Sequence, residues 1–131
     1  MLNKIFLMGR LVRDPELRHT KAGAAVASFT LAVDRDYKDK ASGERGTDFI
    51  DCTAWRSTAE FVARYFTKGR MAVVEGRLQA QDWTDQNGNK RRSFVVITDS
   101  VYFADSPKKA EGLGHPVEME DINVEEGELP F

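Results

Sequence analysis

Four aromatic side chains stand among polar neighbours in this sequence, where a hydrophobic core does not need them. Amide, hydroxyl and carboxylate side chains surround Trp83 in the chain. Phe49 and Trp55 are six residues apart in one expected strand and share its polar face, and Tyr37 lies in a long polar segment. Exposed rings can stack on the unpaired bases of a nucleic acid, with each stacked base contributing ~1–3 kcal/mol. The alternative is that these rings belong to the core, which is the commoner place for a strand tryptophan.

Basic side chains occur throughout the same part of the chain and could neutralise phosphates. Arg77 shares a strand face with Trp83, and Arg56 directly follows Trp55. A cation beside an aromatic ring suits a ligand that carries both phosphates and bases. The expected phosphate contacts are Lys4, Arg10, Arg35, Arg56, Arg77 and Arg91. A scattered basic set is also typical of an ordinary solvated surface, so this alternative stays open.

The charge of the chain is divided unevenly along its length. Residues 111–131 contain seven acidic side chains and no lysine or arginine, whereas residues 1–110 have a net charge of +5. The total of −2 conceals this difference. Such asymmetry indicates a basic body that meets a polyanion and an acidic tail with a separate role, although a merely solubilising tail would look similar.

Alternating apolar residues predict strands, and one helical repeat separates the third strand from the fourth. Ser57 with Glu60 predicts a capping box at the helix start, and Asn87-Gly88 predicts a tight hairpin between the last two strands. The expected strands are 3–12, 24–34, 49–56, 71–83 and 91–104, with a helix at 57–69 and a polar loop at 35–48. This order predicts an all-β fold, a five-stranded OB-fold barrel with one helix between strands three and four.

The remaining aromatic residues of the barrel are expected to fill its interior. Phe29, Phe61, Phe66 and Phe94 are assigned to the core because their strand or helix faces are apolar. Cys52 lies on the inward face of its strand without a histidine nearby in the chain. It is therefore expected to be a small core residue and not a nucleophile.

The sequence contains little that could perform catalysis. Asp14 and Glu16 are close together, but no second carboxylate pair, metal-type Cys/His spacing or phosphate-binding glycine loop accompanies them. No catalytic residue, metal or cofactor is therefore expected. Two alternatives stay open: a small nuclease that uses these two carboxylates, and an OB-fold module that binds RNA.

Several segments together resemble bacterial single-stranded DNA-binding proteins. The resemblance covers about residues 1–104, and it is specific only as a set. It implies an OB-fold homotetramer that coats single-stranded DNA without sequence preference, with stacking positions at Tyr37, Phe49, Trp55 and Trp83. The family often has tryptophan at the first two of these positions and phenylalanine at the third. The segments that carry the resemblance are 2–11, 14–18, 25–33, 59–69, 73–78 and 83–88.

The end of the chain resembles the same family. Residues 105–131 are expected to be a disordered acidic tail after the domain at 1–104, because they have too few apolar residues to form a core. The resemblance implies that the tip, Glu128-Leu129-Pro130-Phe131, docks replication, recombination and repair proteins. No apolar run approaches the ~18 residues of a membrane span, and no secretory signal is recognised. A cytoplasmic, nucleoid-associated protein is expected.

Overall fold

The computed structural model describes residues 1–105, and residues 106–131 lie outside the described part. The elements are β1 (Ile5–Leu11), β2 (Glu16–His19), β3 (Ala25–Lys38), β4 (Arg45–Trp55), α1 (Arg56–Tyr65), β5 (Met71–Thr84) and β6 (Lys90–Phe103). Four of them differ from expectation: β2, β3, β4 and α1, which was expected at 57–69. The polar segment 35–48 is largely strand, because β3 and β4 continue pairing out to Lys38 and Arg45, and β2 was not predicted.

The strands close into a barrel, which confirms the predicted OB-fold. Their order is β1-β5-β6-β4-β3-β2, and additional pairing of Arg10 and Leu11 with β3 closes the five-stranded ring. The short β2 pairs only with β3 and lies outside the ring. Close strand crossings explain two glycines: a Cβ on Gly9 would collide with the backbone of Ala32, and one on Gly76 with the carbonyl oxygen of Ile97.

The helix lies between β4 and β5, as predicted, but the predicted capping box is wrong. The helix begins at Arg56, and its N-cap, Trp55, makes no side-chain cap hydrogen bond. Ser57 is already inside the first turn, because β4 runs into the helix without a loop. Arg56 makes the abrupt change of direction with a φ of +54°. A non-glycine residue in that region costs about 1–3 kcal/mol, which the surrounding structure must offset.

The interior confirms most of the predicted core. Phe29, Phe66 and Cys52 are buried, and Phe61 is partly buried against the same cluster. The prediction for Phe94 is wrong, since its side chain is 56% exposed. Its strand face does point inward near the barrel, but β5 and β6 continue together beyond the barrel, and nothing there covers that face.

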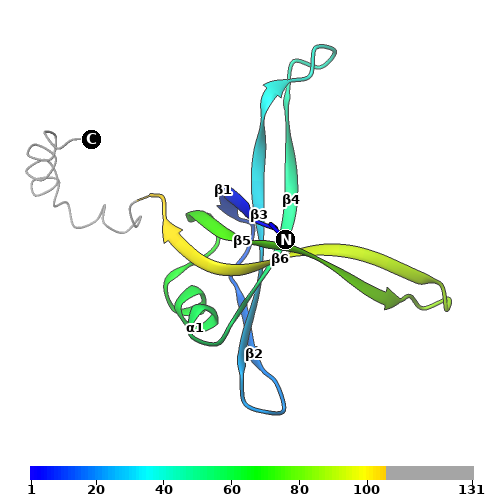
Figure 1. Cartoon of the computed structure of the whole chain (residues 1–131). Helices are drawn as coiled ribbons and strands as arrows, with labels where there is room; N and C mark the ends of the chain where they lie inside the picture. Colours follow the sequence, from blue (N-terminus) through cyan, green and yellow to red (C-terminus); the bar gives the residue numbers. More distant parts are fainter. Residues whose placement is uncertain (106–131) are drawn as a thin grey trace, which may run out of the picture.

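Three hairpins project from the barrel in different directions (Figure 1). The β3–β4 hairpin and the β5–β6 hairpin are long, and we call them the β3–β4 arm and the β5–β6 arm; the β2–β3 hairpin is shorter. Both arms are antiparallel pairs that leave the barrel partway along their strands. The arms carry most of the aromatic side chains singled out from the sequence.

Candidate nucleic-acid interface

The four aromatic residues predicted as stacking platforms are all exposed. The exposed fraction is 64% for Tyr37, 68% for Phe49, 41% for Trp55 and 50% for Trp83. Within residues 1–105, none of them pairs with another ring, since all aromatic pairs there involve only helix α1, Phe66 and Phe103. Four large rings therefore meet water with at least one face free, which is the arrangement that base stacking requires.

Strand pairing sets the position of Phe49 and Trp55. Both lie on the outer face of β4, opposite Ala32 and Val26 of β3. Trp55 is also the last residue of β4, so the abrupt start of helix α1 anchors its backbone on one side and the β3 ladder on the other.

Trp83 lies near the tip of the β5–β6 arm, directly opposite Arg91. A depression of about 510 Å³ surrounds it, lined by Asp82, Trp83, Thr84, Lys90, Arg91 and Arg92. The turn beyond it is held by Asp85, which accepts hydrogen bonds from the backbone N–H groups of Asn87 and Asn89 and from Arg91 Nε. These bonds, above all the one from Asn89, lower the pKa of Asp85. The ring is thus presented on a rigid turn beside cationic groups.

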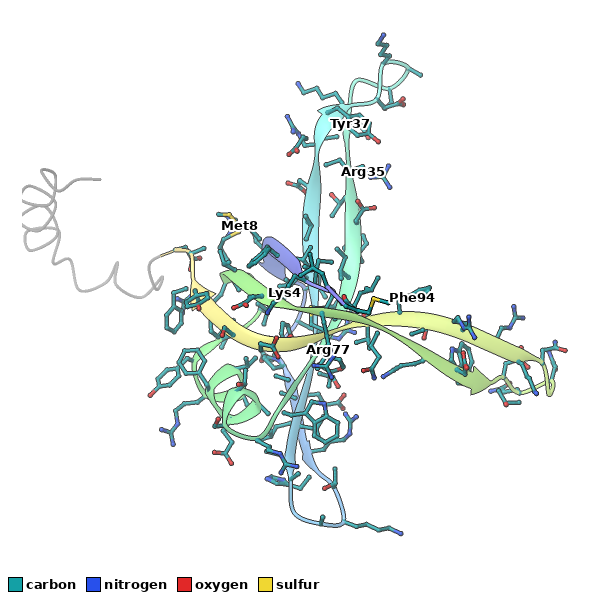
Figure 2. The ribbon with its side chains drawn as sticks, in the orientation of Figure 1. Lys4, Met8, Arg35, Tyr37, Arg77 and Phe94 are labelled. Carbon is teal, nitrogen blue, oxygen red and sulfur yellow. The ribbon has the colours of Figure 1, made fainter. Side chains whose placement is uncertain are left out.

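Tyr37 lies near the tip of the β3–β4 arm, after an irregularity in pairing between Asp34 and Lys38 (Figure 2). A depression of about 310 Å³ includes Tyr37 and Arg35. Arg35 forms a two-pronged ion pair with Asp48, at 2.7 Å for Nη2 to Oδ1 and 3.1 Å for Nε to Oδ2. This hydrogen bonding lowers the pKa of Asp48. The guanidinium predicted as a phosphate contact therefore already has a carboxylate partner.

A groove of about 650 Å³ is bounded by residues of β2, β3, β4, β5 and β6 and by the turn after β1. Trp55 lines it, together with Asp51 and Thr53 from the same face of β4. The other polar side chains that line the groove are two arginines, two carboxylates, two amides and three hydroxyls. They are Arg13, Asp14, Glu16, Arg18, Ser28, Thr30, Gln79, Gln81 and Ser93.

Arg13 and Arg18 were not among the predicted phosphate contacts. Arg18 belongs to β2 and donates a hydrogen bond to Ser28 Oγ at 3.1 Å, which holds it at the groove wall. Because the sequence does not predict β2, nothing in it distinguishes these two arginines from other surface charges. Only the pairing of β2 with β3 brings them to the groove.

The six predicted phosphate contacts fall into distinct groups. Lys4 pairs with Glu75 at 2.9 Å and lies 3.7 Å from Asp99, and these carboxylates raise its pKa. Arg10 donates to the carbonyl oxygen of Gly69. Neither residue lines the groove. The structure therefore does not bring these two together with the aromatic residues.

The other four predicted contacts lie on the arms or next to an aromatic residue. Arg35 forms an exposed ion pair with Asp48. Arg91 pairs with Asp85, whose side chain is only 16% exposed. Arg56 and Arg77 are exposed and make no side-chain hydrogen bond or ion pair with any described residue. These two arginines are the predicted cations that need break no contact to bind an anion.

Of the two candidate catalytic carboxylates, Asp14 makes a structural hydrogen bond. Asp14 Oδ1 accepts a hydrogen bond from the backbone N–H of Lys68 at 2.8 Å, which ties the turn after β1 to the segment after helix α1. Burial raises the pKa of the Cys52 thiol to about 12, so it stays protonated at neutral pH. Within the described residues, no cluster of three metal-ligating side chains occurs. In that same range, no helix is long and apolar enough to cross a membrane.

The profile of the single-strand binding protein family matches residues 2–104. The chain is 46% identical over 112 residues to single-stranded DNA-binding protein 2 of Listeria innocua, covering 86% of this chain and 70% of that protein. It is 49% identical over 114 residues to single-stranded DNA-binding protein A of Bacillus subtilis, of which it spans 65%. Single-stranded DNA-binding protein B of the same organism is 47% identical over 111 residues, or 85% of this chain and 96% of that protein. The barrel with its two arms therefore belongs to the single-strand binding protein family.

Proposed function

We propose that this protein binds single-stranded DNA without sequence preference and performs no catalysis. The observation that carries the proposal is the set of four exposed rings without a ring partner among the described residues. Trp55 lines the groove, and Trp83 and Tyr37 lie in depressions on the arms. The relatives described above are named as single-stranded DNA-binding proteins, which supports the same conclusion. Each ring would stack on a base, and because every base has an aromatic face, stacking tolerates any sequence.

Phosphates would be bound by the cations near these rings. Arg56 and Arg77 are available without breaking an ion pair, and Arg13 and Arg18 line the groove. Arg35 would exchange the exposed carboxylate of Asp48 for a phosphate, which costs little because exposed ion pairs contribute only about 0–1 kcal/mol. Arg91 would have to leave Asp85, whose side chain is only 16% exposed. Lys4 and Arg10 would contribute only if the DNA wraps beyond the groove. No metal or cofactor takes part in this binding.

A titration of intrinsic fluorescence with oligo-dT tests the proposal. Stacking on Trp55 and Trp83 should quench tryptophan emission, and raising the salt concentration should weaken binding because phosphate contacts release counterions. A matched oligo-rU competitor addresses the RNA alternative and should displace the DNA poorly. Absence of quenching at low salt, or preference for the RNA, would contradict the proposal.

The assembly would be a homotetramer built on a surface distinct from the groove. Phe6, Met8, Val73 and Tyr102 are neighbours on the outer face of β1, β5 and β6 and form what we call the outer apolar patch. Phe6, Met8 and Tyr102 are more than half exposed. In addition, residues Ile5–Gly9 of β1 pair with β5 on one side only among described residues. An open strand edge beside an apolar patch favours association of copies. The mass in solution should be four chains, and Met8→Glu should reduce it.

The segment after the barrel would be a separate functional unit. The predicted division into a domain at 1–104 and a tail at 105–131 is supported by the family match, which ends at residue 104. The predicted docking residues Glu128, Leu129, Pro130 and Phe131 lie outside the described residues. A terminal aromatic ring with its α-carboxylate, preceded by glutamates, suits a basic apolar pocket on a partner.

Partners of this tip would be proteins of DNA replication, recombination and repair, and the protein itself would be cytoplasmic and nucleoid-associated. Deleting Phe131 should abolish recovery of such partners while DNA affinity stays equal or rises slightly, because the acidic tail competes with DNA for the basic body. Undiminished partner recovery by the truncated chain would contradict the docking role.

A further inference from the structure

The exposed ring of Phe94 is not explained by the core, by the outer apolar patch or by the four predicted platforms. It lies on the β5–β6 arm directly opposite Ala80, and the next pair toward the barrel is Leu78 with Val96. Leu78 is 43% exposed and Phe94 is 56% exposed, whereas Val96 is fully buried. The core face of the hairpin thus continues into solvent where the arm leaves the barrel. Because alanine is its cross-strand partner, one face of the Phe94 ring has no cover.

The neighbours of Phe94 favour a charged ligand over an apolar protein surface. The next pairs toward the arm tip on the same face are Asp82 with Arg92 and Thr84 with Lys90. Arg92 Nε lies 2.8 Å from Asp82 Oδ1, in an ion pair with both side chains well exposed. Such a pair is weak enough for the guanidinium to turn to a phosphate instead. A ring followed by two cations has the composition of a base-and-phosphate contact.

Phe94 is also continuous with the candidate interface. It borders the groove that contains Trp55, although alternation places its ring on the opposite face of the arm from Gln81 and Trp83. Strand β4 pairs with β6 only at Val96, Ile97 and Thr98, so the edge of β6 is open from Val95 to the arm tip. A single DNA strand that leaves the groove can therefore pass over this open edge of β6 and reach the other face of the arm. In Figure 2, Phe94 and Arg77 are both found where the arm meets the barrel.

We propose that Phe94 is a further base-stacking residue, which receives a nucleotide on the face of the β5–β6 arm opposite to Trp83. The proposal rests on the proposed binding of single-stranded DNA and extends the path of the strand around the arm. The occupant is DNA and not a second copy of the chain, because basic side chains continue this face and the outer apolar patch supplies a different surface for association.

The first test compares variants of the full chain with long oligo-dT. Phe94→Ala should weaken binding about 5- to 150-fold, which is the range for one stacked base. Phe94→Tyr should retain the affinity, and Phe94→Leu should not, because leucine keeps the apolar character without the flat ring. Tyr65→Ala is the matched control: its ring is similarly exposed at 47%, on helix α1 away from the groove, and should leave affinity unchanged.

Two parallel measurements separate the possible outcomes. Trp83→Ala is titrated alongside: if it weakens binding while Phe94→Ala does not, this inference is overturned and the proposed function stands. If neither change matters, the proposed function fails as well. The mass of each variant is measured in solution, and a smaller assembly with unchanged affinity would make Phe94 a contact between copies, which also overturns the inference.

A spectroscopic test does not depend on affinity. The variant W55F/W83F/F94W has its only tryptophan at position 94. Its emission should be quenched at saturation with long oligo-dT, as expected for a stacked indole. Unchanged emission when binding is complete would show that no base reaches this face of the arm.

Discussion

Two groups of aromatic residues in this protein are similarly exposed but differ in what surrounds them. Tyr65 and Phe103 are 47% and 46% exposed, much like Trp83 at 50% and Trp55 at 41%. Tyr65 and Phe103 form a cluster with Phe61 and Phe66 in which the rings contact one another, with centroids 4.6 to 6.3 Å apart. The rings on the arms and in the groove have no such partners.

Cations show the same difference between the two groups. In the cluster, Arg70 lies over the ring of Phe103 at 5.0 Å and is also held by Asp105. Near the groove, Arg56 and Arg77 have no partner among the described residues. The exposed fraction of a ring thus does not separate the cluster from the proposed stacking residues, whereas contacts with other rings within the described residues do.

The largest effect should come from the cluster. Phe66→Ala removes a ring that is 1% exposed and should lower the free energy of unfolding by ~3–5 kcal/mol, the usual cost of such a cavity. Urea denaturation measures it, with Trp83→Ala as the control that should change stability little. Equal losses for both variants would erase the distinction between the two groups.

For DNA affinity we expect the larger effect from Trp83 and not from the cluster. Trp83→Ala should weaken oligo-dT binding by ~1–3 kcal/mol with little effect on unfolding, and Trp83→Phe should largely restore it. Fluorescence anisotropy of labelled DNA measures this without relying on tryptophan emission. An affinity equal to that of the unmodified protein would remove Trp83 from the interface.

A smaller effect is expected on the salt dependence of DNA binding when an arginine without an ion-pair partner among the described residues is replaced. Replacing Arg77 with alanine should reduce the slope of log K against log salt by about 0.7, the value for one phosphate contact on a single strand. Arg70→Lys offers a control in which the cation belongs to the cluster, and its slope should not change. An unaltered slope for Arg77→Ala would place that side chain off the phosphate path.

The smallest effect concerns the turn that presents Trp83. Hydrogen bonds from Asn89 and then Arg91 lower the pKa of Asp85 below its ordinary value of 3.8. A carboxyl whose pKa is lower in the folded state than in the unfolded state stabilises the turn fully when the pH is above its unfolded pKa. This stabilisation is lost as the pH falls through the lower pKa of the folded state. Amide exchange at Asn87 and Asn89 should therefore quicken only in strong acid. In Asp85→Asn this dependence on pH should disappear, and its persistence would assign the titration to another group.

Much of the barrel and part of the interface could be predicted from the sequence. Alternation placed Phe49 and Trp55 on one polar strand face, and Asn87-Gly88 predicted the hairpin, where Gly88 has a φ of +85°. The helix was predicted between the third and fourth barrel strands at 57–69, but it spans Arg56–Tyr65. The capping signal at Ser57 cannot reveal that the chain turns at Arg56 without a side-chain cap. The same limit applies to the segment 35–48, where polar residues form an exposed arm and not a loop.

The chain by itself determines which side of a strand each residue faces, since that depends on neighbours only one or two positions away. Whether anything covers that side depends on segments far along the chain, so the tertiary structure alone decided that Phe94 is exposed while Val96 is buried. It also decided that β2 brings Arg18 to the groove, and that Arg35 and Arg91 already have carboxylate partners. Local pattern sets the direction of a side chain, and long-range packing sets what it meets there.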